Sequence, residues 1–213
     1  MSATRSRTAE PLRGDQTAHS MGLWGLVLGL IVLLMFVAGL SAAALYLEAG
    51  QPRDVVTGET SAGWPPPGID QPSRLLAGIA VLATIGAAVA LTSALRRIAA
   101  GASQQATLLV GVGFLTSIGA GVLLVIDLLQ TPFGWDDHAY TSIYWALTGA
   151  TTLFVGVAAL LAASVLVQLL TGVIDARRHL ELYNSTIYAW FTVVVATLLL
   201  ALVHLLPLVG GSS

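Results

Sequence analysis

The chain has 213 residues, of which 56% are hydrophobic and only 9% are charged, and its formal net charge is −2. A soluble domain carries roughly 25% charged residues, so this composition predicts an integral membrane protein and excludes a disordered chain. The chain has no cysteine and no basic run, which excludes disulfides and thiolate metal sites and argues against nucleic-acid binding.

Five apolar runs follow one another, and each is long enough to cross a ~30 Å hydrocarbon core as a helix. Because lipid requires the backbone of a span to satisfy its own hydrogen bonds, we expect an all-α polytopic membrane protein with five transmembrane helices. Residues 21–207 form this domain, between a flexible polar tail (1–20) and a short C-terminal tail (208–213). The runs are Met21 to Leu47, Leu75 to Leu95, about Ala106 to Ile126, Ala139 to Ile174 with some flanking loop, and about Thr186 to Leu206.

The arginines predict the orientation. With five spans, seven arginines fall on one side of the membrane, and only Arg53 and Arg74 fall on the other. The positive-inside rule then places the N-terminus in the cytoplasm and the C-terminus outside. The seven are Arg5, Arg7, Arg13, Arg96, Arg97, Arg177 and Arg178.

Two polar residues lie within or beside the apolar runs at a similar depth near the outer side. Asp127 closes the third run, and His204 is the only histidine inside a run. An intramembrane carboxylate suggests function, but this position favours an interfacial carboxylate that reaches water. The shared depth also suggests that Asp127 and His204 form a polar pair. One intramembrane histidine without cysteine does not make a recognisable haem or copper site, so we expect no catalytic residue, metal site or cofactor of the chain's own.

Small residues at helical spacing are candidates for close helix packing, within the chain or against a partner. Gly25 and Gly29 are four residues apart, as are Ser117 and Gly121. Such spacing lets two helix backbones approach. The full candidate set is Gly25, Gly29, Ser117, Gly121, Gly149 and Gly156.

Three segments carry a family resemblance. One joins Met35-Phe36 to Trp64-Pro65-Pro66-Pro67-Gly68, one is Tyr140-x-x-x-Tyr144-Trp145-x-Leu147-Thr148-Gly149, and one begins Tyr188-Ala189-Trp190-Phe191. Their order and spacing resemble subunit III of haem–copper oxidases (cytochrome c oxidase), in its divergent five-helix bacterial form. The positions that carry the resemblance are Met35, Phe36, Trp64, Pro65, Pro66, Tyr140, Tyr144, Thr148, Gly149, Tyr188 and Phe191.

The sequence departs from the family pattern at its polar intramembrane positions. Leu33 stands where the family usually has Glu, and Thr151 and Phe154 stand where it has two histidines. The family's Tyr-Trp-His-Phe-Val-Asp motif ends here in Phe191-Thr192-Val193. Proton-related or specific phospholipid roles of those residues are therefore not carried over, whereas the architecture is.

The resemblance implies an accessory, non-catalytic subunit with no haem or copper of its own. Such a subunit packs laterally against the catalytic subunit I, near subunit II, and holds phospholipid while the complex reduces oxygen and pumps protons in the bacterial inner membrane. An accessory of a quinol oxidase or a nitric oxide reductase is a close alternative. A small membrane transporter or channel is the alternative from another class, which the near-absence of charge inside the spans disfavours.

Overall fold

The computed structural model describes the backbone of residues 10–49, 72–174 and 179–210, and the side chains of 22–49, 72–174 and 179–205. These segments contain α1 (Glu10–Ala49), α2 (Arg74–Ala99), α3 (Ser103–Gln130), α4 (Ala139–Leu170) and α5 (Leu180–Gly210), and no strand. All five helices are long and apolar enough to cross a membrane. The predicted fold class, an all-α protein with five membrane-spanning helices, is confirmed.

The helices extend beyond the apolar runs that predicted them. Helix α1 begins at Glu10, inside the segment expected to be a tail, and α5 begins at Leu180 and continues to Gly210. A charged residue ends an apolar run without ending a helix, because helix-forming polar residues continue the same backbone hydrogen bonds above the bilayer. Glu181 stands in the first turn of α5, where the helix dipole favours a negative charge.

Side-chain caps and left-handed glycines set the helix ends. The Ser73 hydroxyl accepts a hydrogen bond from Leu76 N at the start of α2. At the start of α4, His138 Nδ1 accepts from Tyr140 N, while His138 N donates to Thr141 Oγ1 at 2.9 Å. These bonds satisfy amides that have no partner within the helix.

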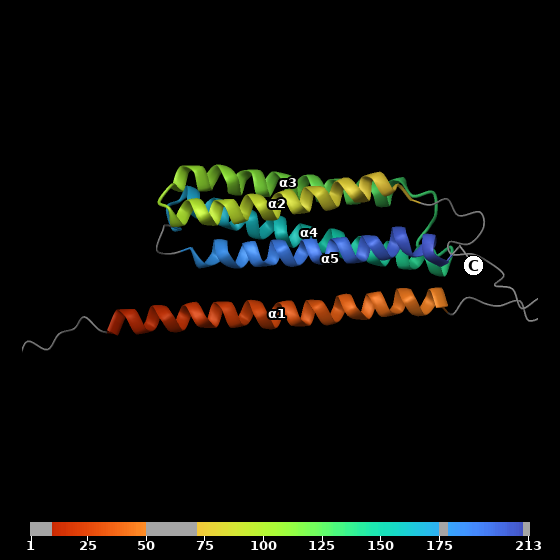
Figure 1. Cartoon of the computed structure of the whole chain (residues 1–213), viewed down its shortest axis with the longest axis horizontal. Helices are drawn as coiled ribbons and strands as arrows, with labels where there is room; N and C mark the ends of the chain where they lie inside the picture. Colours follow the sequence, from red (N-terminus) through yellow and green to blue (C-terminus); the bar gives the residue numbers. More distant parts are fainter. Residues whose placement is uncertain (1–9, 50–71, 175–178, 211–213) are drawn as a thin grey trace, which may run out of the picture.

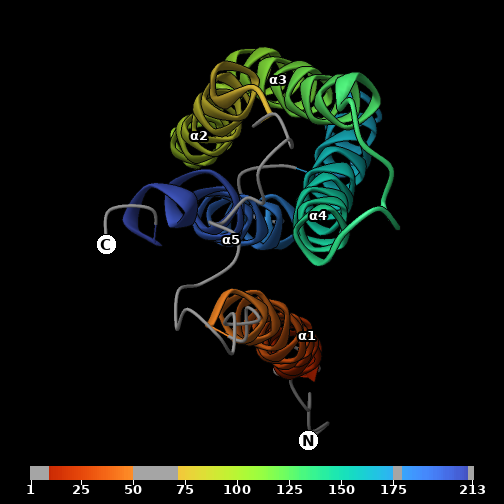
Figure 2. The same cartoon turned by 90° about the vertical axis from the view of Figure 1, so that its right-hand side faces the viewer.

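Helices α2 to α5 pack as a bundle, and α1 lies beside it (Figure 1). Seen end-on, α2, α3, α4 and α5 surround the bundle axis, and α5 separates α1 from α2 and α3 (Figure 2). The most extensive interface is between α2 and α3, whereas α1 has smaller interfaces, with α5 and α4. A turn with Gly101 at φ +77° joins α2 to α3, which makes these two helices antiparallel neighbours.

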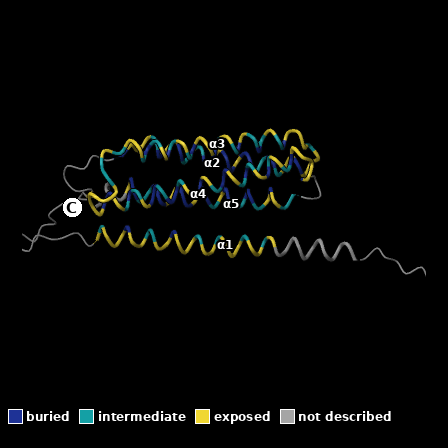
Figure 3. Tube along the Cα trace, turned by 180° about the vertical axis from the view of Figure 1, so that it is seen from behind, coloured by how far each residue is buried: buried dark blue, intermediate teal, exposed yellow. Residues whose placement is uncertain are grey.

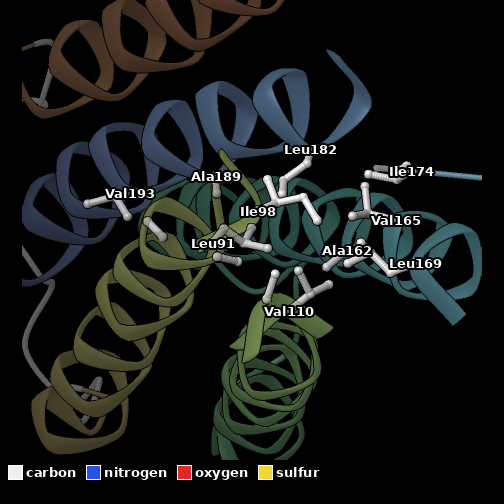
Figure 4. Close-up of a cluster of buried hydrophobic side chains, with 13 residues drawn as sticks. Leu91, Ile98, Val110, Ala162, Val165, Leu169, Ile174, Leu182, Ala189 and Val193 are labelled. Carbon is white, nitrogen blue, oxygen red and sulfur yellow. The ribbon is translucent and has the colours of Figure 1, made fainter. Parts of the chain in front are cut away.

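The burial of side chains also distinguishes α1 from the bundle of α2 to α5 (Figure 3). Among the described side chains of α1, only Val37 and Ala44 are buried, while Trp24 and Met35 are 66% and 70% exposed. A lipid-facing helix loses nothing by such exposure, because acyl chains are as apolar as its side chains. The largest buried cluster instead joins α2, α3, α4 and α5, through residues such as Leu91, Val110 and Val165 (Figure 4).

Candidate functional site

The described residues hold a buried polar cluster at the end of the bundle where α3 ends and α4 begins. Asp127, on the last turns of α3, is only 3% exposed. Its Oδ2 accepts a hydrogen bond of 2.5 Å from the hydroxyl of Tyr144, which is fully buried on α4. The expectation that Asp127 reaches water is therefore wrong: the side chain turns inward, where Tyr144 supplies a donor.

His204 joins this cluster from α5. Its side chain is 7% exposed, and its ring meets the Tyr144 ring edge-on, with centroids 6.4 Å apart and planes at 86°. Asp127 and His204 thus lie on one side of the bundle, near enough to interact electrostatically. The hydrogen bond at Asp127 comes from Tyr144, so Tyr144 links the two residues that the sequence suggested as a pair.

Aromatic rings cover the cluster. Phe133, from the connection between α3 and α4, packs edge-on against Tyr144 at 5.5 Å and against Tyr140 at 6.3 Å. The arrangement encloses one carboxyl group in apolar surroundings with a single hydroxyl donor. Within the described part of the chain, no three histidine, aspartate or glutamate side chains gather as a set of metal ligands.

Tyr144 was predicted only as a position of the family motif and was not connected with Asp127, because a tyrosine near a span end is typical of an interfacial belt. The available signal was topological. Asp127 lies in the last turn of α3 and Tyr144 lies in the second turn of α4, and residues 131–138 connect the two helices. A short connection brings these two helix ends side by side.

A second, apolar cluster occupies the positions where the sequence departs from the family. Phe154 on α4 packs against Phe36 of α1 at 6.4 Å and against Phe191 of α5 at 6.0 Å, and Phe191 also contacts Tyr188 at 6.1 Å. Leu33 packs against the same group. Aromatic and aliphatic contacts thus fill the region where the family pattern places polar residues.

The remaining residues of the family motif include buried residues, an exposed residue and residues that lie outside the described part of the chain. Thr148 and Thr151 are fully buried, and the Thr151 hydroxyl donates to Leu147 O at 2.8 Å, within its own helix. Met35 faces outward. Trp64, Pro65 and Pro66 lie outside the described residues.

The small residues separate into an internal group and an outward group. Ser117 is buried and donates to Gly113 O at 2.9 Å, and a Cβ on Gly121 would lie 3.8 Å from Val155 of α4. Gly113, which is not among these candidates, leaves the least room of the helical glycines: a Cβ there would lie 3.2 Å from Leu91 Cγ. Gly113 lies four residues before Ser117, and this spacing of small residues could have indicated close helix packing there. The outward group has open space around the Cα atoms and comprises Gly25, Gly29, Gly149 and Gly156.

Two grooves run between helices. The α1–α5 groove, of about 440 Å³, has apolar walls that include Leu30, Leu34, Phe191 and Val194. The α2–α5 groove, of about 490 Å³, is mostly apolar, and its polar lining residues are Arg74, Thr197 and His204. Both volumes are in the range of roughly 300–1,000 Å³ that is usual for ligand pockets.

Five apolar helices and a polar cluster inside their bundle define a multi-pass helical membrane protein. The family model for cytochrome c oxidase subunit III matches residues 7–206, nearly the whole chain. The chain therefore belongs to the cytochrome c oxidase subunit III family, which confirms the resemblance seen in its motifs. No curated protein matches it in sequence.

Proposed function

We propose that the chain is the accessory, non-redox subunit III of an aerobic terminal oxidase in a bacterial inner membrane. The family consists of non-catalytic subunits of haem–copper oxidase complexes, and the match over residues 7–206 is the observation that carries the proposal. In this role the chain packs laterally against subunit I, near subunit II, and supports sustained oxygen reduction and proton pumping. Haem and copper belong to those partners.

The outward small residues support a lateral partner surface on α1. Gly25 and Gly29 stand one helical turn apart on the same face, are exposed, and have no atom within 4 Å of the position of a Cβ. Helix backbones approach closely where such residues meet a neighbour. Since α1 buries few of its own side chains in the bundle, it has the most surface left to offer to subunit I.

The α1–α5 groove supports the lipid part of the role. Its walls are formed by apolar residues between positions 27 and 37 of α1 and between 187 and 198 of α5, with Ile31, Val37 and Leu198 among them. In a bilayer acyl chains fill such a groove, and they add to the direct contacts of α1 with α4 and α5.

Deletion of the gene for this chain tests the proposal. Membranes from the deletion strain are expected to start oxygen reduction at a near-normal rate and then to lose activity over successive turnovers. The wild-type gene on a plasmid restores the sustained rate. Oxygen consumption that is unchanged in both rate and duration would contradict the proposed role.

A further inference from the structure

We propose that the polar cluster binds one internal water molecule, which hydrogen-bonds to Thr148 Oγ1 on α4 and to His204 Nε2 on α5, beside the Tyr144 hydroxyl. The water joins α5 to the hydrogen bond that already connects α3 and α4. Asp127 keeps Tyr144 as its donor in this arrangement. The proposal does not depend on which oxidase the chain serves.

The Thr148 hydroxyl differs from those of the other buried threonines. Thr148 is 0% exposed, yet its Oγ1 has no hydrogen-bond partner in the described part of the chain. A buried threonine in a helix commonly donates its hydroxyl to a backbone carbonyl three or four residues earlier. The other buried threonines of the described ranges do so, and they are Thr84, Thr141, Thr151, Thr186 and Thr192. Thr148 does not use this backbone acceptor, which indicates that its hydroxyl has a partner elsewhere.

His204 provides a second, independent observation. Its side chain is more than nine-tenths buried, and Nε2 has no hydrogen-bond partner among the described residues. A buried polar atom without a partner is costly in free energy. Internal water molecules bind where such polar atoms lie close to one another.

Tyr144 brings Thr148 and His204 to one place. Thr148 follows Tyr144 by one helical turn, and its hydroxyl lies near the Tyr144 hydroxyl without a direct hydrogen bond. The His204 ring packs edge-on against the Tyr144 ring, with centroids 6.4 Å apart. Because both side chains adjoin the same tyrosine, one water molecule can reach both. The cluster lies where α3 ends and α4 begins, so water has a short path to it.

The chemistry of these groups favours water as the ligand. The partners are a hydroxyl, an imidazole nitrogen and a lone pair of the Tyr144 phenol, and water can donate to or accept from such groups as each requires. Three hydrogen bonds are the usual number for an internal water. Hard cations prefer several oxygen ligands, whereas the carboxylate of Asp127 already accepts from Tyr144.

The first experiment uses a substitution for which the sign of the effect decides. Thr148→Val removes the hydroxyl and keeps the shape of the side chain. We expect the equilibrium constant for unfolding of the purified full chain in mixed micelles to rise about fivefold, the effect of one net hydrogen bond. Thr151→Val is the matched control on α4, because its buried hydroxyl bonds to Leu147 O of its own helix, and it should have a smaller effect.

A Thr148→Val chain that is as stable as the wild type, or more stable, would overturn the proposal. Removal of a buried hydroxyl that has no partner relieves a cost, whereas removal of one that holds a water loses a hydrogen bond. Stability of the wild-type chain that changes between sodium and potassium salts would assign the site to a cation instead.

The second experiment observes the water at His204. Solid-state NMR of the full chain, isotopically labelled at the histidine ring nitrogens and reconstituted in bilayers, measures magnetisation transfer from water. Transfer is expected to His204 Nε2 as well as to the exposed His138, and the signal lost in His204→Phe identifies His204. In Thr148→Val the transfer to His204 should fall several-fold, while transfer to His138 stays unchanged. Transfer to His138 without transfer to His204 in the wild type, or transfer to His204 that persists in Thr148→Val, would contradict the proposed site.

Discussion

At the scale of single residues, the hydrogen bond from Tyr144 to Asp127 distinguishes the interior of this bundle from a purely apolar one. The bond connects α3 to α4 at 2.5 Å, and both side chains are almost completely buried. A carboxyl group in such surroundings depends on its donor, because water does not replace the donor when it is lost.

The Tyr144→Phe variant tests this dependence. The substitution keeps the ring and its contacts with Phe133 and His204 but leaves Asp127 without its donor. We expect the free energy of unfolding to fall by about 1–3 kcal/mol, measured by unfolding of the chain in mixed detergent micelles. Tyr183→Phe is the control, since Tyr183 is 43% exposed, and it should leave stability unchanged. Equal stabilities for the two variants would mean that the hydrogen bond contributes nothing.

This residue-scale site was only partly predictable. The residue types Asp127 and His204 stood out because charged and polar side chains are rare inside spans. The inward direction of the Asp127 side chain and its hydrogen bond with Tyr144 depend on the rotation of α3 and α4 about their own axes. That rotation could not be predicted from the sequence pattern. The direct pairing of Asp127 with His204 remains a prediction.

At the scale of helices, α2 and α3 share the most extensive contact, and Gly113 is the glycine of α3 that leaves the least room for a side chain. A Cβ at Gly113 would lie 3.2 Å from Leu91 Cγ and 3.4 Å from Ala87 O. Leu91 is 1% exposed within the main cluster and has little room to move (Figure 4).

Gly113→Val is therefore expected to lower the free energy of unfolding by about 1–3 kcal/mol through overpacking. Gly121→Ala is the comparison, because a Cβ there meets Val155 at an ordinary 3.8 Å and the helix gains propensity. The same micelle unfolding assay measures both variants. A Gly113→Val chain as stable as Gly121→Ala would show that the two helices separate freely at this point.

Helix α1 differs from the other helices because most of its described side chains are exposed and not packed in the bundle. The double variant Gly25→Leu and Gly29→Leu places bulk on the face that we assign to subunit I. We expect the yield of subunit I with tagged chain to fall several-fold, as measured on immunoblots of affinity-purified material. Gly119→Leu is the matched control on α3, where the glycine is also exposed with open space. An unchanged yield in the double variant would place the contact on another face.

The helices themselves were predictable, and their ends were not. Each apolar run became one helix, because a chain in lipid has few other ways to satisfy its backbone. The fifth run was expected to begin at about Thr186, yet α5 begins at Leu180 and includes the charged Glu181 in its first turn. The helix ends depend on caps such as His138, whose function arises only from its backbone geometry. The weak packing of α1 could also not be predicted from the sequence, since the composition of α1 resembles that of the other spans.

At the scale of the whole molecule, the distribution of arginine predicts which end of the bundle faces the cytoplasm. The native chain has no cysteine, so a single introduced cysteine gives an unambiguous label. Gln104, near the start of α3, and Asp136, between α3 and α4, are exposed at opposite ends of the bundle.

A membrane-impermeant maleimide added to intact cells should label Asp136→Cys and not Gln104→Cys. After permeabilisation it should label both variants, which shows that each introduced thiol is accessible. This outcome follows from the positive-inside rule with the N-terminus in the cytoplasm. The reverse pattern in intact cells would require the opposite orientation and would contradict the assignment of the seven arginines to the inner side.

In the proposed complex this chain supports an oxidase whose redox chemistry lies in a neighbouring subunit. The most direct measurement is purification of the tagged full chain from native membranes in mild detergent, with identification of its partners and a reduced-minus-oxidised haem spectrum. We expect a stoichiometric haem-bearing subunit I, a haem spectrum, and loss of that spectrum when the chain is separated from its partner. A chain that purifies alone from intact membranes, or that keeps haem after separation, would contradict it.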